Sequence, residues 1–557
     1  MSRFLQFVDP QGRFAKPSLR GDLFGGVTTA VISLPLALAF GVASGAGAQA
    51  GLAGAIIVGL SAAIFGGSRN LISEPTGPMT VVMTAVITNL VAANPEQGLA
   101  MAFSVVIVAG ITQLLLGAFR LGRFITLMPY SVISGFMSGI GILLILLQLP
   151  PLIGAESERS GAIGVLLSLP QMVADARLPE VLMAGLGLLV LFLTPKRVRH
   201  YCPPHLLALG LGTLVAVVAF GPGELERIGH IPMGLPEFRW PVFSPAQMQL
   251  ILLEGGVLGL LGAIDTLLTA MIADSLTRKS HDSDRELVGQ GIANSLAGLF
   301  GGLPGAGATM GTVVNIQVGS TSPWAGIVRS LLLLLVALAI APYLEAIPLA
   351  VLAAIAVKVG FDILDWSFLK RAHAVSRTAA MIMYGVMAMT VFVDLVVAVG
   401  VGVFIANILT IDRLTRLQAS GIRTIDTSDS DLPMTPEERV LFNRGQGKLL
   451  LLHLSGPMIF GVAKAIAREH EELKRAGALV LDLEDVPMLS TTVALALENV
   501  VLDARAASVP VFLVAPEGET RARLERIKLE KRAGLHFCTS RLEALDRAVA
   551  HLEKSNP

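Results

Sequence analysis

Long apolar runs separated by short polar segments dominate the first three quarters of the chain. A helix needs about 20 predominantly apolar residues to cross the hydrocarbon core of a bilayer. We predict such spans, several of them short, near residues 23–43, 50–66, 98–118, 127–148, 180–195, 205–220, 250–275, 287–301, 323–342, 346–361, 378–393 and 395–411. The pattern therefore predicts a polytopic α-helical membrane protein.

Two further apolar runs, near 76–92 and 308–318, begin at segments rich in glycine, proline and threonine. With these two runs we expect about fourteen spans. Residues 73–80 read SEPTGPMT, and residues 305–312 read GAGATMGT. Paired interruptions in corresponding positions of two halves point to the binding site of a secondary transporter. The free N–H groups and the positive dipole end of each half-helix favour an anionic substrate.

Charged residues are concentrated at the C-terminal end. Mean hydropathy is +0.70 and 53% of residues are hydrophobic, far above a soluble enzyme. Of the 42 basic and 42 acidic residues, 20 and 21 lie in residues 411–557. We predict a transmembrane domain over 1–411, a polar linker over 412–440 and a soluble domain over 441–557.

The predicted soluble domain alternates strands with helices. Apolar runs at 449–454, 478–483 and 509–514 are strand candidates. Residues 461–475 and 492–504 have helical patterns. Strands alternating with helices indicate an α/β domain.

Basic residues are unevenly distributed between alternate loops. With a cytoplasmic N-terminus, the inner loops hold Arg69, Arg120, Arg123, Lys196, Arg197, Arg199, Arg278, Lys279, Arg285, Lys370, Arg371 and Arg377. The outer loops hold only Arg159, Arg177, Arg227 and Arg239. This asymmetry satisfies the positive-inside rule, and an even number of spans then places the C-terminal domain in the cytoplasm. The first apolar run follows a polar lead, so we expect it to stay as a span rather than to be cleaved as a signal.

Several functions are disfavoured by composition. Zero formal net charge gives no indication of nucleic-acid binding. The two cysteines, Cys202 and Cys538, cannot supply a Cys₃ or Cys₄ zinc site, and no G-x-x-x-x-G-K-[ST] phosphate loop occurs. We expect neither an enzyme nor an ATP-driven pump, and we expect no cofactor.

Asp265 lies inside an apolar run, and Thr269 follows it at i+4 on the same helical face. An intramembrane carboxylate is costly and is a functional candidate by default. Carboxylate and hydroxyl oxygens suit a hard cation such as Na⁺. Alternatively, Asp265 bridges helices through hydrogen bonds, and Thr269 bonds its own i−4 carbonyl.

Thr76 and Thr309 stand at the starts of the two interrupted segments. Each is placed to offer a hydroxyl and a backbone N–H group to one oxyanion. The alternative is a pair of ordinary helix N-caps without a ligand.

Other polar residues are interpreted as structural. Asp274 is expected to pair with Arg278 at i+4. Asp362 and Asp365, followed by Lys370 and Arg371, are expected in a solvated cytoplasmic loop. No histidine cluster suggests a metal site.

Several uninterrupted strings resemble the SulP family of anion transporters, and within it the cyanobacterial sodium-dependent bicarbonate transporters. They are GDLFGGV at 21–27, LPLALAFG at 34–41, EPTGPMT at 74–80, PYSVISGFMSG at 129–139 and ELVGQG at 286–291. The tail, with LSGPMIFG at 454–461, resembles the STAS domain of the same family. The resemblance covers nearly the whole chain.

The resemblance implies two inverted repeats of seven spans, a mobile core and a gate domain, elevator-type transport, and homodimers formed through the STAS domain. It implies a multi-pass protein of the bacterial inner membrane that takes up bicarbonate with Na⁺. It further implies that Thr76, Ala308 and Thr309 bind bicarbonate. Sodium would be bound by Asp265, Thr269, Gly307 and Thr309, with no other metal.

Two departures from sulfate-type relatives bear on the substrate. Gly311 stands where many relatives carry an arginine, and Leu36 and Ala37 replace polar residues. Both favour a small monoanion coupled to sodium. A transporter of sulfate, chloride or a carboxylate remains an alternative, as does a channel-like or anion-sensing protein that acts through its STAS domain.

The STAS loop that takes a phosphate in bacterial anti-sigma antagonists is not intact at Ser490–Thr492. Dimer packing is therefore a better expectation for this domain than phosphorylation.

Overall fold

The computed structural model describes residues 18–555 except 123–128, 158–160, 196, 199–201, 222, 230–233, 394, 420, 426–433, 446, 460–475 and 530–533. The chain divides into two compact units, Met1–Val403 and Phe404–Pro557. Each unit is described by itself.

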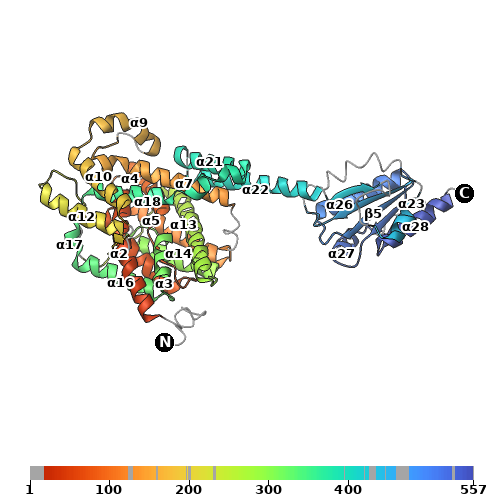
Figure 1. Cartoon of the computed structure of the whole chain (residues 1–557), viewed down its shortest axis with the longest axis horizontal. Coiled ribbons are helices and arrows are strands. Elements are labelled where there is room, and N and C mark those ends of the chain that lie inside the picture. Colours follow the sequence, from red (N-terminus) through yellow and green to blue (C-terminus); the bar gives the residue numbers. More distant parts are fainter. Residues whose placement is uncertain are drawn as a thin grey trace. The chain divides into compact units, whose positions relative to one another are not determined.

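The first unit is helical (Figure 1). Its described helices are α2 (Leu19–Ala43), α3 (Ala48–Phe65), α4 (Gly77–Ala93), α5 (Gly98–Ala118), α7 (Tyr130–Leu147), α8 (Leu149–Ile153), α9 (Gly161–Ala174), α10 (Leu178–Leu193), α12 (Pro204–Ala219), α13 (Met248–Thr277), α14 (Ser283–Leu299), α15 (Thr309–Gln317), α16 (Trp324–Ala339), α17 (Ala341–Leu344), α18 (Leu349–Ile363), α19 (Trp366–Leu369), α20 (Ala372–Val375) and α21 (Arg377–Phe392). The division between the units falls inside α22 (Leu395–Ala419).

Five described helical segments are long and apolar enough to cross a membrane: α2, α3, α5, α7 continued by α8, and α13. The pair α9 and α10, bent by 117°, makes a sixth candidate, and several shorter apolar helices accompany them. Large apolar side chains such as Leu193, Val218 and Phe392 are exposed, as expected of a surface that faces lipid. The helical membrane fold is as predicted, whereas the count of fourteen spans and the inverted repeats stay predictions.

Small residues let neighbouring helices approach closely. A Cβ atom added at Gly110 of α5 would lie 2.4 Å from the backbone nitrogen of Ser295 in α14. One added at Gly291 of α14 would lie 2.6 Å from the carbonyl oxygen of Gly110. Glycine is therefore required on both sides of this contact, as in other membrane helix pairs.

A two-stranded antiparallel ribbon joins the two interrupted segments. Strand β1 (Ser73–Glu74) precedes α4 and pairs with β2 (Ala306–Gly307), which precedes α15. Ser73 is opposite Gly307, and Glu74 is opposite Ala306. The ribbon places the first turns of α4 and α15 beside each other, although more than 200 residues separate them.

The second unit is an α/β domain with a five-stranded sheet in the order β3-β4-β5-β6-β7. Its elements are β3 (Ile422–Ile425), α23 (Pro436–Arg444), β4 (Leu449–Ser455), β5 (Ala478–Asp485), α26 (Thr491–Ala506), β6 (Val511–Val514), α27 (Glu519–Arg526), β7 (Leu535–Cys538) and α28 (Arg541–Ser555). Strand β3 is antiparallel to β4, and the other neighbours are parallel.

The three predicted strands and the helix at 492–504 are confirmed as β4, β5, β6 and α26. The helix predicted at 461–475 lies outside the described residues. Strand β3 and the start of α23 lie within 412–440, the segment predicted as a linker. Strand β3 is short and only half-buried, so its alternating pattern is weak in the sequence. Regular structure thus begins inside the predicted linker, while the domain boundaries stay a prediction.

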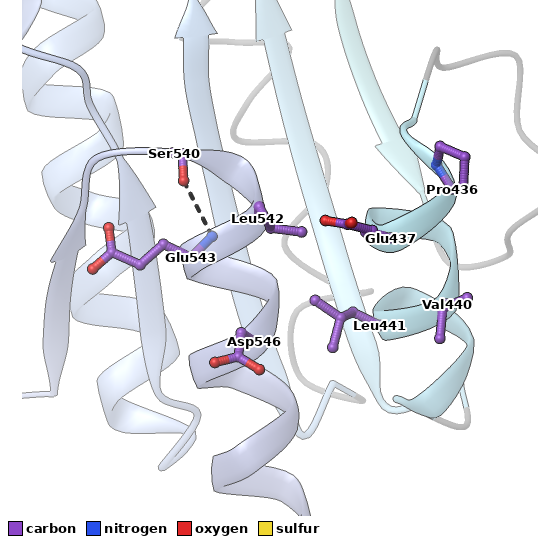
Figure 2. A pocket seen from close by; sticks show the side chains of 8 residues that line it. All are labelled: Pro436, Glu437, Val440, Leu441, Ser540, Leu542, Glu543 and Asp546. Carbon is purple, nitrogen blue, oxygen red and sulfur yellow. Dashed lines mark hydrogen bonds between the residues drawn. The ribbon is translucent and has the colours of Figure 1, made fainter.

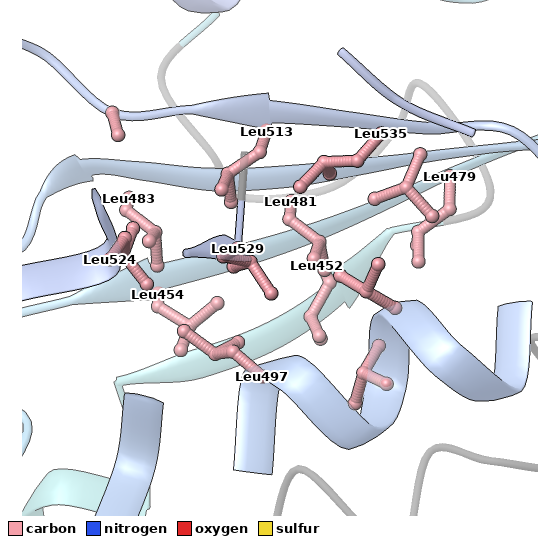
Figure 3. Packing of buried hydrophobic residues seen from close by; sticks show 14 of the residues in the cluster. Leu452, Leu454, Leu479, Leu481, Leu483, Leu497, Leu513, Leu524, Leu529 and Leu535 are labelled. Carbon is pink, nitrogen blue, oxygen red and sulfur yellow. The ribbon is translucent and has the colours of Figure 1, made fainter. Parts of the chain in front are cut away.

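Leucine-rich packing covers both faces of this sheet. On one face, Leu452, Leu481 and Leu513 meet Leu497 of α26 and Leu524 of α27 (Figure 3). On the other face, side chains of β4, β5 and β6 pack against α23 and α28. Strands buried on both faces read as continuous apolar runs, which explains why β4 and β5 were predictable.

Candidate functional site

A cavity of about 380 Å³ lies at the starts of α4 and α15. It is lined by Leu36, Phe40, Glu74, Pro75, Thr76, Gly77, Pro78, Met137, Asp265, Gly307, Ala308, Thr309, Met310, Val359, Asp362 and Ile363. Five of the six predicted site residues therefore surround one cavity. The sixth, Thr269, is buried and contacts two of them by hydrogen bonds.

Asp265 lies in the middle of α13 and is only 6% exposed. Its Oδ2 atom accepts a hydrogen bond of 2.9 Å from the hydroxyl of Thr76. Among the described residues, no basic side chain pairs with Asp265. The site thus contains a buried carboxylate, open to a cavity, without a fixed countercharge.

The hydroxyl of Thr269 reaches across to the second interrupted segment. It donates to the carbonyl oxygen of Gly307 at 2.9 Å and lies 2.9 Å from the hydroxyl oxygen of Thr309. The i−4 bond considered for Thr269 is therefore not formed, because its single hydrogen is used at Gly307. Three of the four predicted sodium ligands form a continuous chain of oxygen atoms.

The two helix starts present backbone groups to the cavity. Thr76 is the N-cap residue of α4, yet its side chain makes no capping bond, and its hydroxyl donates to Asp265 on α13. Ala308 is the N-cap residue of α15, and Thr309 is the first helical residue. The interpretation of Thr76 as an ordinary capping threonine is wrong. The N–H groups of a first helical turn have no partner within their helix, so those of α15, and those of α4 apart from Pro78, which has none, are available to an anion.

Gly307 is closely enclosed by α13. Its N–H group donates to the hydroxyl of Thr266 at 3.1 Å. An added Cβ atom would lie 3.2 Å from the Cα atom of Thr266 and from the Cβ atom of Thr269. The β2 backbone is therefore held directly against α13.

Sequence reasoning missed a buried ion pair between α16 and strand β1 of the ribbon. Arg329 of α16 is fully buried and donates to Oε2 of Glu74 at 2.7 Å. It also donates to the carbonyl oxygen of Ser73 at 3.1 Å and to the hydroxyl of Ser33 at 2.8 Å. A Cβ atom at Gly59 would lie 2.2 Å from the guanidinium, so this glycine makes room for Arg329.

Arg329 does not line the cavity, and Glu74 neutralises its charge. A Cβ atom at Gly311 would lie 3.4 Å from Oε1 of Glu74. The pair therefore adds no uncompensated positive charge to the cavity. A single arginine within the apolar run of α16 was the sequence signal, because such residues are costly and functional.

Amide side chains hold β2 from the other side. Asn294 of α14 donates to the carbonyl oxygen of Gly305 and accepts from its N–H group, at 2.9 and 2.8 Å. Gln290 donates to the same carbonyl at 2.9 Å. Gln290 belongs to the ELVGQG string near the start of α14, and Asn294 follows it in the same helix. The string thus contains one residue that positions the site without lining it.

Two structural interpretations of acidic residues are wrong. Asp274 accepts hydrogen bonds from His281 rather than pairing with Arg278, whose backbone is left-handed at the end of α13. Asp362 lies in the cavity wall and not in a solvated loop, because α18 extends to Ile363.

Asp365, which was also expected in a solvated loop, accepts hydrogen bonds from the hydroxyl groups of Tyr130 and Ser134, both at 2.7 Å.

The second unit contains a shallow open pocket of about 640 Å³ between α23 and α28 (Figure 2). Its side chains are apolar and acidic, among them Leu441, Leu542, Glu437 and Asp546. Ser490 caps α26 by accepting from the N–H group of Val493 at 3.3 Å. Neither feature brings together the groups expected to bind a small anion.

Together, the interrupted helices, the unpaired carboxylate and the α/β tail define an anion transporter of the sulfate permease type with a STAS domain. The chain belongs to the sulfate permease family (SulP), whose model matches residues 19–386, and residues 443–544 match the STAS domain.

Individual members of the family differ in how similar they are to this chain. The chain is 53% identical to the bicarbonate transporter BicA of Picosynechococcus sp. over 96% of this chain and 95% of that protein. It is 54% identical to BicA of Synechocystis sp. over the same shares. A putative sulfate transporter of Bacillus subtilis, YvdB, is 30% identical over 94% of this chain and 98% of its own.

Solved structures agree with the fold. The transmembrane domain of a cyanobacterial BicA is 56% identical, with a TM-score of 0.64 over 68% of this chain and 97% of that chain. Murine Slc26a9 in the inward-facing state gives a TM-score of 0.84 over 99% of this chain and 95% of its own, at 18% identity.

Proposed function

We propose that the protein takes up bicarbonate together with Na⁺ by secondary active transport. The observation that carries this proposal is Asp265, a buried carboxylate that faces the cavity of the interrupted helices with Thr76 as its hydrogen-bond donor. The identity to two bicarbonate transporters over nearly the whole chain supports the substrate.

The bicarbonate site consists of Thr76, Ala308 and Thr309. Hydroxyl and backbone N–H groups at the starts of two helices suit a small oxyanion, and both helix dipoles favour a negative charge there. The Glu74–Arg329 pair adds no net charge, so a divalent sulfate would remain uncompensated with one sodium ion. A monoanion with one Na⁺ and an ionised Asp265 is less costly.

Asp265, Thr269, Gly307 and Thr309 bind the sodium ion through their oxygen atoms. The chain of 2.9 Å contacts from Gly307 through Thr269 to Thr309 supports this assignment. Na⁺ offsets the cost of moving an anion against an inside-negative potential, about 2.3 kcal/mol per charge per 100 mV. A 1:1 ratio makes transport electroneutral.

The transport cycle is an elevator movement of a core domain, which carries the interrupted helices, against a gate domain. The protein has fourteen spans arranged as two inverted repeats of seven. The transmembrane domain covers residues 1–411, the linker 412–440 and the STAS domain 441–557. The protein forms homodimers through the STAS domain. It lies in a bacterial inner membrane, with its N-terminus and its STAS domain on the cytoplasmic side.

The test is uptake of ¹⁴C-bicarbonate into proteoliposomes with and without an inward sodium gradient. Wild type should show sodium-stimulated uptake, and Asp265→Asn should lose it. Glu254→Gln is the matched control: this acid lies on the same helix but lines a different cavity, so its removal should leave the sodium dependence unchanged.

Labelled sulfate and chloride are measured in parallel. Entry of either anion without bicarbonate would overturn the substrate assignment. Conductive anion flux that does not saturate or depend on sodium would instead indicate a channel.

A further inference from the structure

A second cavity, of about 650 Å³, adjoins the one at the interrupted helices. Met310 and Asp362 line both cavities, so the two share a wall. The second cavity is lined further by α2, α10, α12, α15 and α18, including Gln317 and Lys358. An anion that moves from the first cavity into the second would pass α18.

Lys358 and Asp362 are the charged residues of α18, an otherwise apolar helix. The ammonium of Lys358 donates to both carboxylate oxygens of Asp362, one helical turn away. It also lies 5.2 Å from the centre of the Phe192 ring on α10, a cation–π contact. The lysine side chain is 16% exposed and that of Asp362 is 35% exposed.

Among the described residues that line the two cavities, Lys358 is the only lysine or arginine. Arg329 is fully buried and bound to Glu74, so it is not available to a passing anion. Asp362, by contrast, is partly exposed, and rotation of its side chain away from Lys358 leaves the ammonium facing the cavity. A cation in a partly desolvated passage attracts anions strongly.

We propose that the second cavity is a transient binding site for small monoanions, in which the substrate replaces Asp362 as the partner of Lys358. No covalent step occurs; one ion pair is exchanged for another. With the anion absent, Asp362 neutralises Lys358. With the anion bound, Asp362 competes with it for Lys358 and so limits how long the anion stays. The identity of the anion as bicarbonate rests on the proposed function, whereas the site itself rests on the cavity and its charges.

The charges are tested with an engineered cysteine as reporter. Gln317 is exposed and lines the second cavity, so Gln317→Cys is made in a full-length chain that also carries Cys202→Ala and Cys538→Ala. The rates of modification by a sulfonate and by a trimethylammonium methanethiosulfonate are compared in purified protein. The ratio of the anionic to the cationic rate reports the local potential.

Removal of the positive charge in Lys358→Gln should lower this ratio about fivefold or more, and Asp362→Asn should raise it by a similar factor. Lys358→Arg keeps the charge and should restore the wild-type ratio. Arg547→Gln on α28, which breaks an i,i+4 ion pair in the second unit, is the matched control and should change nothing. An unchanged ratio in both α18 variants would overturn the site.

Protection by bicarbonate separates the site from the proposed function. Bicarbonate should slow the anionic labelling in wild type, more so in Asp362→Asn, and not in Lys358→Gln. Protection by chloride but not bicarbonate would keep the site and overturn the assignment of bicarbonate, whereas protection by sulfate alone would overturn the proposed monoanion site. In uptake measurements, Asp362→Asn should lower both KM and the maximal rate, because a tighter intermediate site slows release. A merely structural role would lower the maximal rate without lowering KM.

Discussion

Three of the five carboxylates that are buried in the described part of the first unit have contrasting partners. Asp22 accepts from the hydroxyl groups of Ser320 and Ser322 and from nearby backbone N–H groups. Glu74 is paired with Arg329. Asp265 has one threonine hydroxyl and a cavity beside it. Because a buried charge is costly unless it is compensated, Asp265 is the one of the three suited to bind a mobile cation.

Replacement of Thr76 by valine removes the donor of Asp265 at nearly constant volume. We expect sodium-driven uptake to fall by about tenfold or more, since an unsatisfied buried carboxylate costs at least 1–3 kcal/mol. Thr76→Ser should keep most activity. Thr88→Val is the control, because its exposed hydroxyl only bonds the carbonyl of Thr84. Equal activity of Thr76→Val and wild type would contradict the role of this contact.

The Glu74–Arg329 pair permits a second prediction at this scale. Arg329→Gln alone should destabilise the protein by about 3–5 kcal/mol, because it leaves a buried carboxylate unpaired. The double variant with Glu74→Gln should recover part of this loss. Thermal unfolding of the purified protein measures both. A double variant that is no more stable than Arg329→Gln would show that charge compensation is not the cause.

At the scale of elements, the ribbon of β1 and β2 fixes the two interrupted helices against each other. It is held by side chains from three helices, Arg329 of α16, Asn294 of α14 and Thr266 of α13. Thr312 of α15 also accepts from the N–H group of Ile72, just before β1. The cavity therefore depends on helices that lie far apart in the sequence.

Close helix packing leads to a prediction for glycine. Gly110→Ala should destabilise the protein by about 1–3 kcal/mol, because its Cβ atom would overlap the α14 backbone. Gly256→Ala is the matched control: its Cβ atom would have no neighbour within 4 Å among the described residues, so it should be neutral or slightly stabilising. The two unfolding midpoints are compared in the same detergent. Equal midpoints would contradict close packing between α5 and α14.

At the scale of the whole molecule, a membrane unit and an α/β unit are built on different principles. The first is stabilised by small residues and buried polar contacts between helices, and the second by an apolar core on both faces of a sheet. The second unit also has a buried ionic cluster. In it, Asp482 of β5 lies 2.8 Å from Nδ1 of His453 and accepts from Arg541 of α28 at 2.6 Å.

This cluster predicts a pH dependence. Burial by itself raises the pKa of Asp482, but the hydrogen bond with His453 and the Arg541 guanidinium outweigh it and hold the pKa below its usual value near 3.8. A lowered folded pKa stabilises the domain above the unfolded value, and this contribution is lost as pH falls through the folded value.

We therefore expect amide exchange protection of β5 in the full-length protein, corrected for intrinsic exchange, to decrease below about pH 4. Asp482→Asn should remove this part of the pH dependence, whereas Glu519→Gln on the exposed start of α27 should retain it. Identical pH profiles for wild type and Asp482→Asn would contradict the assignment.

The sequence by itself determined the membrane class, the α/β tail and most of the candidate site. Long apolar runs and the concentration of charge are local properties, so they survive without tertiary information. The interrupted segments and Asp265 were visible because glycine, proline and a carboxylate are costly inside apolar runs.

Only the tertiary structure decided which of these residues meet. Sequence spacing suggested that Thr269 could bond within its own helix, but the structure brings Gly307 and Thr309 to it instead. Likewise, Arg329 and Glu74 are 255 residues apart, and Asp362 belongs to the wall of a cavity rather than to a loop. Partner choice for a buried polar group depends on which elements pack beside it, and that is a property of the whole fold.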